Sequence, residues 1–179
     1  MSKKHPVVAI TGSSGAGTST VKDACEHIFF RQEITPLVVE GDSFHSLDRA
    51  AFKVAVAEND EKGNNSFSHF GPEANHFDKI AETFESYGKT GSCKRRYYIH
   101  SDEEALFHNE RLGGTTYTAG EFTPWEDITE KTDLLFYEGL HGGVADGDID
   151  VSKFVDLLIG VVPIVNLEWI QKIFRDNAQ

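Results

Sequence analysis

Long apolar runs and excess basic charge are absent from this 179-residue sequence. No apolar run approaches the roughly 20 residues that a membrane-spanning helix needs, and the N-terminus lacks the apolar stretch of a signal peptide. We therefore expect a cytoplasmic protein with no membrane partner. The 17 basic and 29 acidic residues give a net charge of −12. This charge repels polyanions, so we expect no nucleic acid partner.

Cysteine is also scarce. The two cysteines, Cys25 and Cys93, are too few for a disulfide framework, and Cys25 falls in a predicted amphipathic helix. We expect both thiols to be reduced and structural. Apolar residues make up 39% of the chain, which is typical of a globular protein. The length fits one domain, so we predict that residues 1–179 form a single domain.

Apolar runs bounded by turn residues alternate with segments of helical periodicity. This alternation is typical of an α/β fold, a doubly wound and mainly parallel sheet with flanking helices. The pattern is weaker between residues 88 and 124, where 94–99 looks like a strand and 101–107 opens like a capped helix. Elsewhere the sequence predicts strands at 6–11, 36–40, 132–138 and 154–162, and helices at 18–31, 49–58, about 77–87 and from 164 onward.

The stretch GSSGAGTST, residues 12–20, has the spacing of the phosphate-binding loop GxxxxGK[ST], with Thr18 at the lysine position. Glycines in such a loop let backbone N–H groups surround phosphates, and the hydroxyl after the lysine position, here Ser19, binds Mg²⁺. A GxGxxG dinucleotide loop fits less well because no third glycine is in register. A glycine-rich turn without a ligand is the other alternative. The residues expected to bind nucleotide phosphates are Gly12, Ser13, Ser14, Gly15, Ala16, Gly17, Thr18, Ser19 and Thr20.

Two acidic residues close predicted strands, where the strand ends of a doubly wound sheet converge on a ligand. Glu138 suits Mg²⁺, and Asp42 suits a general base that takes the proton of an attacking hydroxyl. A strand-end carboxylate and a turn-forming aspartate are the structural alternatives. His45, Arg49 and Lys53 follow at intervals of four and suit a phosphate-bearing acceptor. From the spacing alone, a solvated helix face is favoured for these three.

Five blocks of the sequence carry a family resemblance. On these blocks the chain resembles the bacterial phosphoribulokinase family, within the P-loop kinases that include uridine and pantothenate kinases. Threonine in place of the loop lysine is a feature of that family. Its members continue further, so the resemblance implies that a C-terminal part is lacking here. The blocks are GSSGAGTST at 12–20, EGDSFH at 40–45, SHF at 68–70, FYEGLHG at 136–142 and NLEWIQKIFRD at 166–176.

The resemblance implies a P-loop kinase that transfers the γ-phosphoryl group of MgATP to the 1-hydroxyl of D-ribulose 5-phosphate. The product, ribulose 1,5-bisphosphate, serves photosynthetic carbon dioxide fixation in the Calvin cycle. The resemblance also implies a homo-oligomer with NADH and AMP as effectors. Two alternatives stay open: a nucleotide-binding regulatory P-loop protein without transferase activity, and another small-molecule kinase such as a relative of uridine kinase.

The resemblance also implies roles for particular residues. Asp42 matches the catalytic base, Glu138 and Ser19 match the Mg²⁺ site, and Lys172 matches a cation that meets the nucleotide phosphates. Asp176, four residues after Lys172 on the same helix face, matches a second active-site carboxylate, although spacing alone favours a surface ion pair. His45, Arg49 and Lys53 match the sugar-phosphate contacts.

Other polar clusters have plainer interpretations. His69 and His76 fit no standard zinc spacing, so we expect structural or substrate-loop roles for them. For His100 and the basic run at 94–96, a solvated surface is favoured over contact with an anionic effector.

Overall fold

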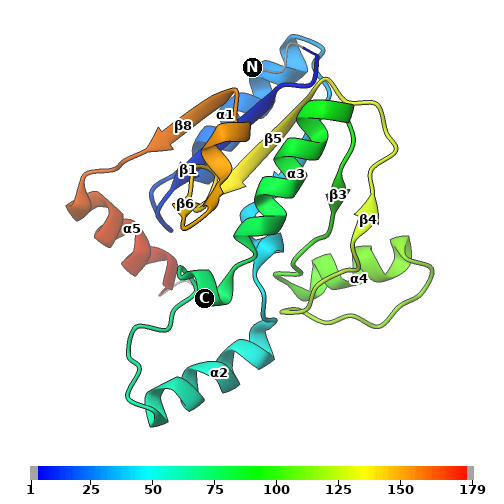
Figure 1. The fold of residues 1–179 in the computed structure, drawn as a ribbon. Helices are drawn as coiled ribbons and strands as arrows, with labels where there is room; N and C mark the ends of the chain where they lie inside the picture. Colours follow the sequence, from blue (N-terminus) through cyan, green and yellow to red (C-terminus); the bar gives the residue numbers. More distant parts are fainter. Residues whose placement is uncertain (1–3, 177–179) are drawn as a thin grey trace.

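A four-stranded parallel sheet forms the centre of the computed structural model (Figure 1). The structure describes residues 4–176, apart from the side chains of Gln171, Arg175 and Asp176. The strand order is β2-β5-β1-β8, in which all three pairings are parallel. This topology confirms the predicted fold class. The strands are β1 (Val7–Gly12), β2 (Pro36–Glu40), β5 (Leu134–Gly139) and β8 (Leu157–Val161).

Helices and short elements connect the strands and mostly start where the sequence predicts. Ser101 caps the helix predicted after residue 101, since its hydroxyl accepts a hydrogen bond from the Glu104 N–H at 3.2 Å. The helices are α1 (Thr18–Arg31), α2 (Arg49–Glu61), α3 (Phe77–Thr90), α4 (Asp102–Arg111) and α5 (Val165–Asp176). The short elements are η1 (Gly41–Phe44), η2 (Pro72–Ala74), η3 (Val151–Phe154), β3 (Lys94–Arg95), β4 (Glu126–Asp127), β6 (Ala145–Asp146) and β7 (Ile149–Asp150).

Two predicted strands are shorter than the sequence indicates. Within 94–99 only β3 is a strand, and Tyr98 forms an isolated bridge with Phe122. The predicted strand at 154–162 begins only at Leu157, because η3 takes up its first residue. The predictions relied on the aromatic and β-branched residues of 97–99 and on the apolar run of 157–162, and such residues do not show whether a neighbouring strand is available to pair with.

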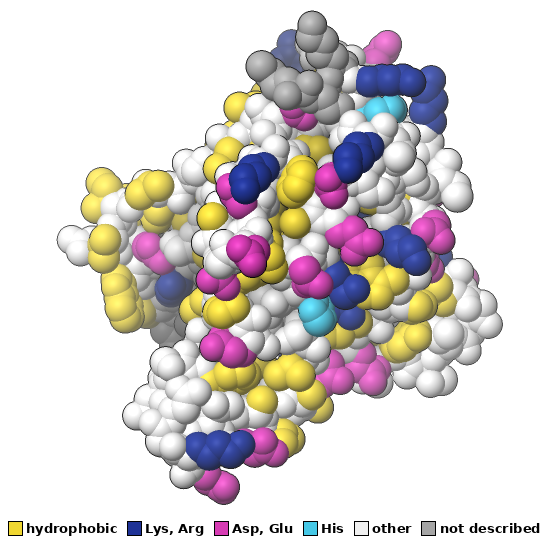
Figure 2. All heavy atoms as spheres, viewed as in Figure 1, with side chains coloured by type: hydrophobic (Ala, Val, Ile, Leu, Met, Phe, Trp, Pro, Cys, Tyr) yellow, Lys and Arg dark blue, Asp and Glu magenta, His cyan; other side chains and the backbone are white. Residues whose placement is uncertain are grey.

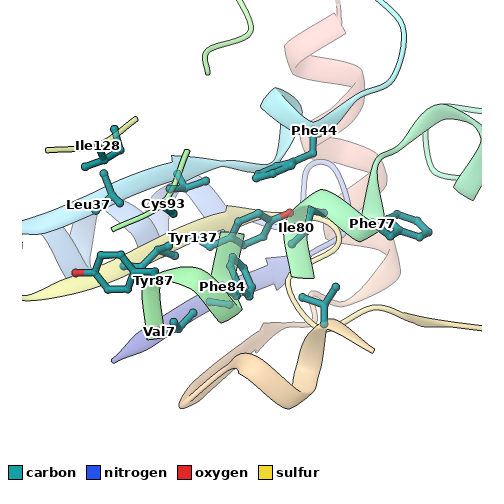
Figure 3. Packing of buried hydrophobic residues seen from close by; sticks show 14 residues of the cluster. Val7, Leu37, Phe44, Phe77, Ile80, Phe84, Tyr87, Cys93, Ile128 and Tyr137 are labelled. Carbon is teal, nitrogen blue, oxygen red and sulfur yellow. The ribbon is translucent and has the colours of Figure 1, made fainter. Parts of the chain in front are cut away.

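The sheet is packed on both faces because consecutive residues of β5 point to opposite sides. Phe136 lies on the face covered by α1, where its ring meets Phe29 edge-on at 4.9 Å between centroids. Tyr137 lies on the face covered by α3, and its ring lies between those of Phe84 and Phe44 (Figure 3). This larger core holds the end of β5 and η1 together, and it thereby supports the site described below.

Several of the exposed apolar side chains lie on β8 and α5. The side chains of Leu157 and Leu158 on β8 are 53% and 44% exposed, and Trp169 and Phe174 on α5 are 64% and 73% exposed. Figure 2 shows the apolar cluster over α5. Within residues 4–176, no helix has both the length and the apolar character needed to cross a bilayer. Both cysteines are free thiols, as expected.

Replacement of Phe84 tests the core beneath the site. Phe84→Ala removes a fully buried ring, and we expect a loss of about 3–5 kcal/mol in the free energy of unfolding. The matched control is Phe107→Ala on α4, where the ring is 63% exposed and the expected change is within about 0.5 kcal/mol. Urea unfolding of both variants measures the difference. Equal losses would show that α3 does not hold the core in place.

Candidate active site

The carboxyl ends of β1, β2 and β5 meet at one edge of the sheet. Glu40 on β2 stands in register with Glu138 on β5. The next residues of the two strands, Gly41 and Gly139, approach so closely that a Cβ on Gly41 would lie 2.9 Å from the Gly139 Cα. A pocket of about 580 Å³ opens over this edge. Its lining brings together Gly12, Ser13, Ser14, Gly15, Thr18, Ser19, Asp42, His45 and Glu138.

The predicted phosphate-binding loop has the backbone that such a loop needs. Gly15 and Gly17 have φ angles of +85° and +95°, a region that other residues rarely adopt. Gly17 is also the N-cap of α1, so the N-terminus of that helix points at the pocket. Ala16 is buried, and Thr20 is exposed on α1 outside the pocket lining. The six loop residues that line the pocket are therefore the ones placed to face a ligand.

Lys172 lies against this loop, although it is far away in the sequence. A Cβ on Gly15 would come within 3.0 Å of the Lys172 Cγ and 3.4 Å of its Cε. The Lys172 ammonium lies 3.1 Å from the carboxylate of Glu168, and the same carboxylate oxygen accepts a hydrogen bond from the Ser13 hydroxyl at 2.9 Å. The hydrogen bonds from Ser13 and then Lys172 lower the pKa of Glu168. Helix α5 thus places a cation beside the loop that lacks its own lysine.

Asp42 and His45 form an ion pair at the other side of the pocket. The His45 Nε2 lies 3.5 Å from the Asp42 carboxylate, and its Nδ1 lies 2.8 Å from the Asn75 side-chain oxygen. Asn75 is oriented because its amide nitrogen donates to the carbonyls of His69 and Gly71. Both ring nitrogens therefore face acceptors. This arrangement favours the doubly protonated ring.

The ionisation of the pair follows from these contacts. The hydrogen bond with His45 lowers the pKa of Asp42, and the positive charge of the ring adds to that effect. Burial opposes the charged form of His45, but the bonds to Asp42 and Asn75 outweigh burial and raise its pKa. Asp42 is thus a carboxylate at neutral pH, and its side chain is 55% exposed toward the pocket.

The structure separates the three predicted acceptor contacts. His45 lines the pocket. Arg49, at the start of α2, reaches its edge, where the guanidinium donates to the His100 carbonyl at 3.5 Å. Lys53 is exposed one turn further along α2, outside the pocket lining. Asp176 lies in α5, but its side chain lies outside the described residues.

Two basic groups that the sequence interpretation assigned to the surface lie in the site or directly behind it. The His100 ring lines the pocket, and its Nε2 lies 3.9 Å from Asp42. Arg96 is half-buried and donates to the backbone carbonyls of Ser43 and His45. The expectation of a solvated surface is wrong for Arg96, whereas the His100 side chain is 43% exposed as expected and also faces the pocket. Only the folding of 94–100 against η1, between segments about 50 residues apart, brings them there.

Lys22 is a further basic residue of the pocket that the motif analysis missed. Its ammonium pairs with Glu40 at 3.0 Å. Burial disfavours the charged form of Lys22, but the hydrogen bond to Glu40 and the charge of that carboxylate outweigh the effect of burial. The pKa of Lys22 is therefore raised. The signal that could have found it is its position four residues after Thr18, on the same face of α1.

The residues present fit a magnesium nucleotide. Mg²⁺ in such sites takes one or two protein oxygens and completes its shell with phosphates and water. Ser19 and Glu138 supply a hydroxyl and a carboxylate at the same pocket. Among the described residues, no group of three or more His, Cys, Asp or Glu side chains could hold a metal alone. A site completed by phosphates matches this donor set better than an all-protein metal site.

Comparison with known proteins agrees with this geometry. Residues 7–179 match the sequence model of the Phosphoribulokinase / Uridine kinase family. The chain is 50% identical over its whole length to the chromosomal phosphoribulokinase of Cupriavidus necator, of which it covers 59%. It is 48% identical to a phosphoribulokinase of Nitrobacter vulgaris, with 99% of this chain and 59% of that one covered.

A solved structure is also similar. The phosphoribulokinase from Rhodobacter spheroides superimposes with a TM-score of 0.82 at 41% identity, with 99% of this chain and 58% of that chain covered. The chain thus spans about three fifths of the length of the relatives that it matches.

The ion pair between Asp42 and His45 predicts a window of pH in which it stabilises the fold. Its contribution is fully present below the ordinary His pKa of 6.5 and is lost as the pH rises through the raised pKa of His45. On the acid side it is present above the ordinary Asp pKa of 3.8 and is lost as the pH falls through the lowered pKa of Asp42. We expect His45→Gln to lower the free energy of unfolding by about 1 kcal/mol or less. The loss should be largest between pH 3.8 and pH 6.5, where the contribution of the pair is fully present.

Urea unfolding at several pH values measures this dependence. The control is His27→Gln, which changes an exposed histidine of α1. A cost for His45→Gln that does not vary with pH would show that the pair contributes no charge interaction.

Proposed function

The chain belongs to the Phosphoribulokinase / Uridine kinase family, and we propose that it transfers the γ-phosphoryl group of ATP to the 1-hydroxyl of ribulose 5-phosphate. The observation that carries the proposal is the position of Asp42. This carboxylate, kept ionised by His45, faces the same pocket as the phosphate-binding loop. A base and a phosphoryl donor therefore fit side by side. The names of the relatives support ribulose 5-phosphate as the acceptor.

The nucleotide end of the site is built from backbone groups, hydroxyls and one lysine. The N–H groups of the loop and the N-terminus of α1 would bind the phosphates of ATP. Ser19 and Glu138 would hold Mg²⁺, which supplies positive charge to the phosphates. Lys172 would replace the missing loop lysine, since it lies against Gly15 and needs only to exchange Glu168 for a phosphate oxygen. Asp176 is proposed as a second carboxylate on the metal side.

At the acceptor end, Asp42 takes the proton of the attacking hydroxyl. As that oxygen bonds to the γ-phosphorus, the bond to ADP breaks and the hydroxyl proton passes to the carboxylate. The lowered pKa of Asp42 keeps it ready to accept the proton but makes it a weak base. Asp42 therefore contributes in two ways, by accepting the proton and by placing the acceptor hydroxyl. His45 and Arg49 would bind the phosphate of the sugar, with Lys53 on the outer part of α2.

Other features of the proposal come from the family resemblance. These are a homo-oligomeric assembly, NADH and AMP as effectors, a cytoplasmic location and a role in the Calvin cycle. A regulatory protein without transferase activity would not need the ionised Asp42 beside the phosphate loop, so the kinase is the better-supported proposal.

Consumption of ATP with and without ribulose 5-phosphate tests the function. We expect the purified protein to consume ATP only when the sugar phosphate is present, and uridine to have no effect. An equal rate of ATP consumption with and without ribulose 5-phosphate would refute the kinase assignment.

Replacement of Asp42 tests the proposed base. Asp42→Asn should lower kcat by about 10²–10⁴-fold, the usual contribution of a general base, with little change in the KM for ATP. A near-normal kcat for this variant would remove Asp42 from the role of base.

Replacement of Lys172 tests the relocated cation. We expect Lys172→Met to lower kcat by about 10²–10³-fold, because one charged donor to the transferring group is lost. The control is Lys89→Met, which removes an exposed lysine paired with Glu85 on α3. Steady-state kinetics with varied ATP separate kcat from KM. If both variants behave alike, Lys172 is a surface lysine and another group provides the missing charge.

A further inference from the structure

Asp42 and His45 lie on a short connection whose shape is held from outside. The connection consists of η1, a single turn, and the residues that lead into α2. Arg96 reaches it from the segment after β3. The Arg96 Nε donates to the Ser43 carbonyl at 2.6 Å, and its Nη2 donates to the His45 carbonyl at 2.5 Å. One guanidinium thus joins two carbonyls of the segment that bears the base and its partner.

The guanidinium of Arg96 is itself held in place. Its Cζ lies 3.8 Å from the ring centroid of Phe122 and 4.7 Å from that of Trp125, and contacts of this kind with aromatic rings are attractive. Burial lowers the pKa of Arg96 to about 10, so the group keeps its charge at neutral pH. Among the ion pairs of the described residues, none includes Arg96. Its charge therefore meets the two carbonyls and the two aromatic rings instead of a carboxylate.

An arginine suits this place for a geometric reason. Its Nε and Nη2 donors are fixed in one plane, so the two carbonyls that they bind must keep a fixed separation. The carbonyls belong to Ser43 and His45, and Asp42 directly precedes the first of them. The turn cannot open while both bonds are made. The 3.5 Å approach of His45 Nε2 to the Asp42 carboxylate depends on that turn. A lysine, with one flexible ammonium, cannot impose the same spacing.

We propose that Arg96 is a positioning residue for phosphoryl transfer, which acts by fixing the backbone of residues 43–45 and so the contact between Asp42 and His45. This inference rests on the proposed function, because it concerns the same site. Arg96 acts from behind the turn through backbone carbonyls. It differs from His45, which acts through a side chain that lines the pocket.

The test compares Arg96→Lys with Arg95→Lys. Both changes keep the charge and remove a guanidinium, but the contacts of Arg95 are with the Val38 carbonyl at 3.3 Å and the Tyr97 ring, away from residues 43–45. We expect Arg96→Lys to lower kcat by about 10²-fold, because a displacement of about 1 Å at a catalytic group has that effect. The KM for ATP should stay unchanged. Arg95→Lys should stay within about threefold of the unchanged protein.

A second measurement separates positioning from general stability. The titration of the His45 ring, followed by NMR, reports its contact with Asp42 directly. The charged, polar or titratable groups that face this ring are Asp42, Asn75, His69, Tyr98 and Arg96, and His141 also interacts with it electrostatically. Arg96→Lys keeps the positive charge, so a fall in the pKa of His45 in this variant would come from loss of the Asp42 contact. We expect such a fall, and no fall in Arg95→Lys.

The outcomes separate the two proposals. An unchanged His45 titration in folded Arg96→Lys overturns the positioning role, whatever the activity. If neither the unchanged protein nor any variant phosphorylates ribulose 5-phosphate, the proposed function fails, while a lowered pKa of His45 in Arg96→Lys still supports the role of Arg96 in fixing residues 43–45. Should Arg96→Lys not fold, Phe122→Leu weakens the hold on the Arg96 guanidinium, because it removes one of the two aromatic rings that the guanidinium contacts. A smaller fall in kcat and in the His45 pKa is then expected, and the absence of both overturns the proposal.

Discussion

The in-register parallel pairing of β1, β2 and β5 is the constraint on which the site depends. Because the three strands run in the same direction and stop together, the phosphate loop, Asp42 and Glu138 leave the sheet at one edge. The close approach of Gly41 and Gly139 keeps the two acidic strand ends adjacent. The core around Tyr137 supports both ends from beneath. A shift of register by one residue would move these strand ends and their side chains together.

Electrostatics in the site are local and oppose the net charge of the protein. With a net charge of −12, the surface as a whole repels phosphates. The pocket compensates with backbone N–H groups, a helix N-terminus and a few cations placed individually. Each of these cations is paired with an acid: Lys172 with Glu168, Lys22 with Glu40 and His45 with Asp42. A phosphate bound as proposed would therefore compete with carboxylates that already hold the cations in position.

Much of the fold and part of the site could be predicted from the sequence, because these features depend on neighbours in the chain. The glycine spacing of residues 12–20, the strands that end at Glu40 and Glu138, and the helix after residue 101 are local patterns. Arg96 and His100 could not be assigned in this way, because they meet Asp42 and His45 only after segments about 50 residues apart have packed together. The spacing of four that groups Arg49 with Lys53 describes a helix face correctly, but it cannot show how far that face extends from the pocket.

Helix α5 connects the exposed apolar surface to the nucleotide end of the site. Its outer side chains, among them Trp169 and Phe174, are largely exposed, while its contacts with the loop are made through Glu168 and Lys172. Under the proposed function, the position of this helix and the binding of a nucleotide phosphate would be thermodynamically linked. A contact that covered the apolar side of α5 would lower the free energy needed to hold Lys172 in place, and by reciprocity nucleotide binding would strengthen that contact by the same amount. The proposed nucleotide affinity would then depend partly on a surface that the nucleotide does not touch.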